Sequence, residues 1–251
     1  MVVPLRVLIG TLPNLARNFL IVSFIAATLA AVAGFGGAAI LLPVLVATFG
    51  VREAIPILTV AQLVGNGSRV WFNRQELDRR VVAWFAVGGV PMALIGGFLF
   101  AKAPLTPLTR ILGVFLILIV VWRHSRLKTR WRPTIYSFAG IGAGASFLSA
   151  LLGSVGPLMA PFFLAYGLVK GAYIGTEALS TVVMHITKLI AYRSAAVLPL
   201  HAVVVGLILG PIMILGSFTG KRIVDRLSET AFIWMVEAAL VAAGVLFLWK
   251  A

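Results

Sequence analysis

Two rows of polar side chains interrupt segments of the chain that are otherwise apolar. The rows consist of Thr59, Gln62, Asn66 and Arg69 in the first segment and of Glu177, Thr181, His185 and Lys188 in the second. Because a helix turns by about 100° per residue, the spacings of three and four residues hold each row within about 80° of one helix face. Amide, hydroxyl and imidazole groups in this arrangement favour a small polar ligand, and the two cations favour an anion.

Two glycine-containing turns offer main-chain donors in addition to these rows. Short apolar segments begin at Gly36-Gly37-Ala38 and at Gly156-Pro157. Free N–H groups at a helix N-terminus bind anions without any side chain, and proline is tolerated in the first turn. We therefore expect both turns to contribute to a binding site, although close helix packing would also explain the glycines. If they form the site, we expect Gly37→Val and Gly156→Val to abolish transport while the protein still inserts, and Gly88→Ala in an ordinary membrane helix to be tolerated much better.

The sequence contains no catalytic motif of the common classes. His185 lacks the second His and the Glu of a zinc protease helix, and neither a Gly-x-Ser-x-Gly turn nor a Walker A sequence occurs. The absence of cysteine excludes thiol catalysis, disulfides and thiolate metal sites. We therefore expect no enzyme activity, no catalytic residue, no metal and no cofactor.

The composition places these segments in a membrane. Of 251 residues, 61% are hydrophobic and 11% are charged, whereas a soluble domain carries about 25% charged residues. Apolar runs of about 20 residues recur, and each is long enough to cross a bilayer core of about 30 Å. The net charge of +14 follows from basic connections between these runs, as the positive-inside rule predicts, so we expect no nucleic-acid partner.

Hydropathy divides the chain into ten apolar segments. They cover approximately residues 19–33, 38–49, 53–73, 81–100, 107–122, 134–152, 157–167, 170–192, 199–219 and 229–248. At about 1.5 Å per residue, segments 38–49 and 157–167 are too short to cross a membrane. We expect an all-α polytopic membrane protein with about eight long helices and further short helices that are broken or re-entrant.

The two halves of the chain are copies of one unit. Gly34-x-x-Gly37 corresponds to Gly153-x-x-Gly156 at an offset of 119 residues, and the last three members of the two polar rows correspond at the same offset. We therefore divide the chain into a first transmembrane repeat (1–122), a basic loop (123–133) and a second transmembrane repeat (134–251).

Charge predicts the orientation of the two repeats. The basic loop carries five Arg and Lys residues and no acid, which marks it as cytoplasmic. Five crossings in each half make the repeats inverted and place the basic ranges 74–80, 170 and 221–226 inside. Counting each broken pair of segments as one crossing would instead place residues 221–226 outside, and we prefer the inverted arrangement.

The two polar rows predict one cavity near the middle of the membrane. Ionisable groups within a bilayer normally face a bundle interior, and inversion would place Arg69 and Lys188 at opposite ends of the cavity. The alternative is that both cations extend separately to the membrane interface. Glu177 lies too deep for that alternative, and it either forms a structural ion pair or binds a proton.

The motifs as a set resemble a known family. Gly34-Phe35-Gly36-Gly37 with Pro43, the polar third segment, Asn73-Arg74 and a second copy over 153–193 are similar to the TauE/SafE family, also called the sulfite exporter or TSUP family. The resemblance covers about residues 19–248, and Ser154-Val155 and Pro157 stand where the family often has glycines. It implies a multi-pass secondary transporter of the cytoplasmic (inner) membrane that exports small sulfur-containing anions such as sulfite, sulfoacetate or related organosulfonates.

The expected substrate site combines the turns and the rows. Its residues are Gly36, Gly37, Ala38, Gln62, Asn66, Arg69, Gly156, Thr181, His185 and Lys188, with Glu177 as the candidate for proton coupling. The expected partners are a small sulfur oxyanion, the lipid bilayer and a coupling ion, either H⁺ or Na⁺. The alternatives are a carrier of another small anion or solute, and a membrane subunit that transports nothing.

Overall fold

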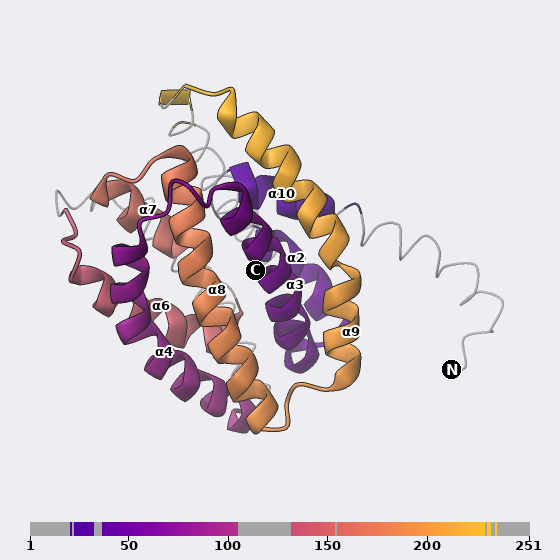
Figure 1. Cartoon of the computed structure of the whole chain (residues 1–251). Coiled ribbons are helices and arrows are strands. Elements are labelled where there is room, and N and C mark those ends of the chain that lie inside the picture. The colour runs from indigo at the N-terminus through magenta and orange to yellow at the C-terminus, as the bar shows by residue number, and fades with distance from the viewer. Residues whose placement is uncertain are drawn as a thin grey trace.

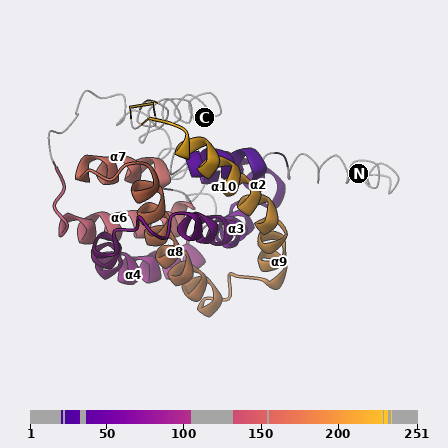
Figure 2. The same cartoon turned by 45° about the horizontal axis from the view of Figure 1, so that its top comes forward.

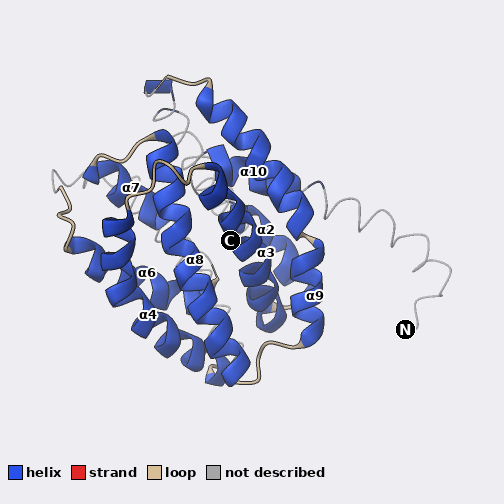
Figure 3. Cartoon of the chain, viewed as in Figure 1, coloured by secondary structure: helices blue, strands red, loops and turns tan. Residues whose placement is uncertain are grey.

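The computed structural model describes residue 21, residues 23–32, 37–104, 132–153 and 155–228, and residues 230, 231 and 234. Within these ranges the chain consists of helices and their connections, without a strand (Figure 3). The expected segment 107–122, most of 229–248 and residues 123–131 of the basic loop lie outside the described residues. The predicted all-α fold is confirmed for the part that is described.

The helices follow the predicted segments closely. An apolar helix at Ser23–Val32 precedes α2 (Gly37–Phe49), α3 (Val51–Phe72), α4 (Arg79–Lys102), α6 (Ser137–Leu152), α7 (Gly156–Tyr166), α8 (Lys170–Ser194), α9 (Leu200–Ile208) and α10 (Gly210–Asp225). The expected segment over 199–219 corresponds to one helical stretch, Leu200–Asp225, which is interrupted at Leu209 between α9 and α10 and continues beyond the predicted end. Pro211 explains the interruption, since it has no N–H to donate to the preceding turn.

The outer surface of the helices is apolar, as a bilayer requires. Two helical stretches, Arg79–Lys102 and Leu200–Asp225, are long and apolar enough to cross a membrane, with mean hydropathies of 1.9 and 2.2. Large apolar side chains are exposed along several helices, among them Val87, Ile95, Leu99, Ile186, Ile190, Leu207, Ile208 and Leu215. Because water would make such a surface unfavourable, these faces are suited to lipid.

Helices α3 and α8 lie antiparallel in the centre of the molecule (Figures 1 and 2). The turn after α3 meets the beginning of α8, where the main-chain N–H of Asp78 donates to Thr176 Oγ1 at 2.9 Å. Gly175 permits this contact, because a Cβ there would lie 2.6 Å from Leu77 and 2.9 Å from Asn73. The antiparallel packing brings the two polar rows face to face.

The two halves of the sequence interleave rather than form separate bundles. One hydrophobic core joins Phe85 of α4, from the first half, to Phe138 of α6 and Phe163 of α7, from the second. A second core joins Leu41 of α2 and other first-half residues to Tyr192 of α8. In Figure 1, α4 accordingly lies beside α6 and α8, and α10 lies beside α3.

Glycines set the distance between α4 and α6. A Cβ at Gly88 would overlap the main-chain oxygen of Ala139, and one at Gly142 would overlap that of Phe85. Gly88→Ala is therefore unsuitable as a tolerated comparison, because Gly88 lies at a helix contact and not on a free face. Gly67 of α3 is the better control position, since a Cβ there would meet nothing within 4 Å.

Basic residues gather at the end of the molecule where α3 ends. Lys221 Nζ of α10 lies 3.7 Å from Glu76 Oε1, in the turn between α3 and α4, and Gly171 of α8 contacts the same carboxylate. The basic ranges 74–80, 170 and 221–226 therefore share one end. Arg52, Lys102 and Arg193 lie at the opposite helix ends.

Candidate functional site

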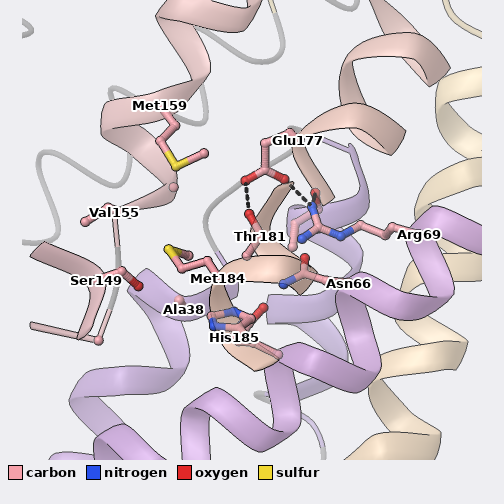
Figure 4. Close-up of a pocket in the computed structure, with 14 residues that line it drawn as sticks. Ala38, Asn66, Arg69, Ser149, Val155, Met159, Glu177, Thr181, Met184 and His185 are labelled. Carbon is pink, nitrogen blue, oxygen red and sulfur yellow. Dashed lines mark hydrogen bonds and ion pairs between the residues drawn. The ribbon is translucent and has the colours of Figure 1, made fainter. Parts of the chain in front are cut away.

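A cavity of about 40 Å³ lies between the polar faces of α3 and α8. Polar and charged groups line much of it, including Gln62, Asn66, Arg69, Ser149, Glu177, Thr181 and His185. Small or flexible residues complete the wall, namely Ala30, Ala38, Gly153, Val155, Gly156, Met159 and Met184. Figure 4 shows Arg69 and Asn66 of α3 directed toward Glu177, Thr181 and His185 of α8.

Three side chains present unused hydrogen-bonding atoms to this cavity. Gln62 Nε2, both amide atoms of Asn66 and His185 Nδ1 are buried without a hydrogen-bond partner among the described residues. The residues are only 5%, 1% and 4% exposed. Because an unpaired buried polar atom costs about 1–3 kcal/mol, this concentration of them indicates a place for a ligand or ordered water.

Arg69 joins three helices. Its Nη1 donates to the main-chain oxygen of Ala30 at 2.9 Å and lies 3.5 Å from Glu177 Oε2. Thr181 Oγ1 donates to the other oxygen of the same carboxylate at 3.1 Å. Glu177 therefore forms a buried ion pair, one of the two roles that its position in the sequence allowed.

Lys188 is fully buried, with 0% exposure, and Arg69 is 4% exposed. The alternative in which both cations reach the membrane interface is therefore wrong. Lys188 does not line the cavity itself, but its Nζ donates to Ser149 Oγ at 3.1 Å, and Ser149 does line it.

The two cations are bound in corresponding ways. Arg69 and Lys188 each donate to a residue 39 positions earlier, Ala30 and Ser149. Ala30 and Ser149 are themselves related by the offset of 119 residues. The cavity is thus lined by corresponding residues of the two rows: Gln62 and its counterpart Thr181, and Asn66 and its counterpart His185.

The break between α6 and α7 forms one wall of the cavity. Gly153 ends α6 with φ of +84°, a conformation that favours glycine. Val155 then precedes α7, and its carbonyl accepts from the N–H groups of both Leu158 and Met159. Pro157 has no N–H, so Gly156 is the residue of this first turn whose N–H remains available.

The two expected glycine-containing turns therefore differ in which of their residues reach the cavity. Ala38 and Gly156 line the cavity, whereas Gly37 begins α2 and is not among the lining residues. Gly36 lies outside the described residues. Within the described chain, no three His, Asp or Glu side chains come together as a metal site would require.

Sequence reasoning missed several residues of the wall. Ser149 and Gly153 carried a usable signal, because a serine one turn before a glycine break at the start of a short helix is well placed to enter a membrane cavity. Met159, Met184, Ala30 and Val155 carried none, since apolar residues are common throughout the sequence.

A buried polar cavity between antiparallel helices with apolar outer faces is the arrangement of a helical membrane protein with an internal polar site. The family model for the sulfite exporter TauE/SafE matches residues 19–247. The chain therefore belongs to this family, which is a family of membrane transporters, as the motifs predicted. No curated protein and no solved structure matches the chain.

Proposed function

We propose that the protein is a secondary transporter that exports small sulfur-containing anions, with sulfite as the first candidate. The observation that carries this proposal is the cavity between α3 and α8, into which Gln62, Asn66 and His185 direct unused polar atoms. The predicted site residues that line it are Ala38, Gln62, Asn66, Arg69, Gly156, Glu177, Thr181 and His185. Membership of a sulfite exporter family supports the same substrate class.

The size of the cavity favours a compact anion. At about 10–15 Å³ for each water molecule, a cavity of 40 Å³ holds roughly three. Sulfite is of comparable size, whereas sulfoacetate and longer organosulfonates would require the walls to move. We therefore expect sulfite to bind more tightly than sulfoacetate.

Inverted repeats would explain how the site serves both sides of the membrane. The antiparallel course of α3 and α8, and the equivalence of the Arg69–Ala30 and Lys188–Ser149 contacts, support a pseudo-two-fold relation between repeats 1–122 and 134–251. A site on such an axis can be exposed to either side when the two halves exchange conformation. Inversion also agrees with the basic ranges that share one end of the molecule.

Glu177 is the candidate residue for coupling to protons. It lines the cavity and forms an ion pair with Arg69. Glu177 therefore competes with an incoming anion for the Arg69 guanidinium. Protonation of Glu177 would release Arg69 and remove a negative charge that repels the anion. The coupling ion in this proposal is H⁺. Na⁺ is the alternative, and transport measured with imposed H⁺ or Na⁺ gradients distinguishes the two.

Reconstituted vesicles of bacterial inner-membrane lipid test the proposal. Purified protein is incorporated, and counterflow of labelled sulfite, sulfoacetate and thiosulfate is measured with imposed H⁺ or Na⁺ gradients. We expect saturable sulfite counterflow that Asn66→Leu reduces at least tenfold. Gly67→Ala is the matched control on the same helix, because its Cβ would face open space.

Two outcomes would contradict this function. Saturable counterflow of a different anion alone would assign the same cavity to another substrate. No counterflow of any solute by monodisperse protein would favour a membrane subunit that transports nothing.

A further inference from the structure

Two buried cations, Arg69 and Lys188, lie at or near the cavity, and of the two only Arg69 forms an ion pair with a carboxylate of the described residues. Arg69 forms an ion pair with Glu177 at 3.5 Å, so the net charge at that end is close to zero. The ion pairs of the described chain include none with the Lys188 ammonium. The uncompensated positive charge therefore lies at Lys188, which is 0% exposed.

Ser149 stands between this charge and the cavity. Its Oγ accepts from Lys188 Nζ at 3.1 Å, and an ammonium is only a donor. The hydroxyl hydrogen of Ser149 must therefore point away from Lys188, and the cavity that Ser149 lines is available to it. Figure 4 places Ser149 on the side of the cavity opposite to Arg69.

The first half of the chain lacks this arrangement. The counterpart of Ser149 is Ala30, which accepts from Arg69 through its main-chain oxygen and has no hydroxyl. The two ends of the cavity thus differ in chemistry, although they correspond in position. One end holds a carboxylate that repels anions, and the other holds a hydroxyl donor supported by a cation.

We propose that the anion binds at the Ser149 end of the cavity, where the Ser149 hydroxyl donates to it and Lys188 supplies the attracting charge from behind. This inference rests on the proposed function and names the part of the site that holds the substrate. Ser149 is a direct ligand in this proposal, and Lys188 is a positioning residue that orients its hydroxyl. Gly156 and His185, whose Nδ1 has no hydrogen-bond partner among the described residues, line the same cavity.

A structural role for Lys188 has to be separated from this one. Ser149 lies in the last turn of α6, where a helix carries about half a unit of negative charge that a cation stabilises. This helix charge would compensate only part of the Lys188 charge. If Lys188 only stabilised the end of α6, the loss caused by Lys188→Gln would be the same with serine or with alanine at residue 149. The two roles can therefore be distinguished.

Binding of sulfite to purified protein in detergent tests the proposal, with isothermal titration as the readout. We expect Lys188→Gln to weaken binding roughly 10–150-fold, the range for a charge-assisted hydrogen bond. Ser149→Ala should weaken binding about tenfold, and Ser149→Thr should restore most of the loss because it keeps the hydroxyl. The double variant Lys188→Gln/Ser149→Ala should be no weaker than Lys188→Gln alone, since the two residues act as a unit.

Variants at the other end of the cavity provide the comparison. Glu177→Gln should strengthen binding, because it removes the repelling charge and releases Arg69. Arg69→Gln/Glu177→Gln removes the ion pair without changing the net charge, so it should weaken binding far less than Lys188→Gln does. Each variant is also checked for monodispersity and melting temperature.

The outcomes separate this inference from the function on which it rests. Sulfite binding that survives Lys188→Gln and Ser149→Ala but is lost in Arg69→Gln/Glu177→Gln would overturn the inference and leave the proposed function intact. Independent, additive losses in the double variant would also overturn it. Failure of the unaltered protein to bind sulfite would overturn both proposals together.

Discussion

Arg69 illustrates how a buried charge is held in this membrane protein. Its guanidinium contacts Ala30 in the helix Ser23–Val32 and Glu177 in α8, while the residue itself belongs to α3. Removing one partner of a buried ion pair leaves the other charge uncompensated, which is strongly destabilising. The ion pair therefore connects three helices around the cavity as well as setting its charge.

Removal of one partner of this ion pair should destabilise the protein. We expect Arg69→Gln to lower the free energy of unfolding by about 3–5 kcal/mol, because it leaves the Glu177 carboxylate buried without its cation. Adding Glu177→Gln should recover most of this loss. Denaturation of the purified variants in detergent measures the effect, and equal stability of the single and double variants would contradict it.

Which residues line the site could be predicted from the sequence more readily than which of their side chains contact each other. The spacing of Gln62 and Asn66 on one helix face, and its repetition at Thr181 and His185, was sufficient to predict a common cavity. The pairing of Arg69 with Glu177, and the withdrawal of Lys188 behind Ser149, depend on how far α3 and α8 slide along each other. That register is set by contacts such as Gly175 against Asn73, which no periodicity within one helix reveals.

Helix α6 shows how closely packed elements depend on particular glycines. Its residues Gly140, Gly142 and Gly144 are spaced by two, so that Gly142 faces α4 while the other two would each place a Cβ in open space. The position of an apolar helix could be predicted from hydropathy. Which of its faces meets another helix could not, because lipid and protein interiors are equally apolar.

These three glycines should therefore respond differently to the same substitution. We expect Gly142→Ala to destabilise the protein by about 1–3 kcal/mol, because the added Cβ overlaps the main chain of Phe85 and forces α4 and α6 apart. Gly140→Ala and Gly144→Ala should be neutral or stabilising by about 0.5–1 kcal/mol. Melting temperatures of the three variants in one detergent test this order, and a loss at Gly140 or Gly144 matching that at Gly142 would refute the assigned interface.

A second prediction concerns the turn between α6 and α7, where Gly153 ends α6. Gly153 has a φ of +84°, and a Cβ there would also lie 3.2 Å from Ile55. We expect Gly153→Ala to lower stability by about 1–2 kcal/mol and to weaken sulfite binding, since the turn positions Val155 and Gly156 in the cavity wall. Gly144→Ala in the same helix is the control, and normal binding by Gly153→Ala would show that the turn does not position the site.

At the scale of the whole molecule, the helices of the two halves are interleaved. Helix α4 of the first half packs on α6 and α8 of the second, and α10 of the second packs on α3 of the first. The constant offset between the halves predicts a duplication. The exchange of helices between them could not be predicted, because copies related by one offset can pack either separately or interleaved.

The orientation of the molecule can be tested directly, because the chain contains no cysteine and single cysteines can be introduced. Arg80 precedes most of α4, Arg222 lies near the end of α10, and His201 lies at the start of α9. The contact between Lys221 and Glu76 places the first two positions at one end, and the positive-inside rule places that end in the cytoplasm. We expect a membrane-impermeant maleimide to label Arg80→Cys and Arg222→Cys in inside-out vesicles and His201→Cys in right-side-out vesicles. Labelling of His201→Cys from the same side as Arg80→Cys would contradict the predicted crossing of α9 and α10, and with it the inverted arrangement of the repeats.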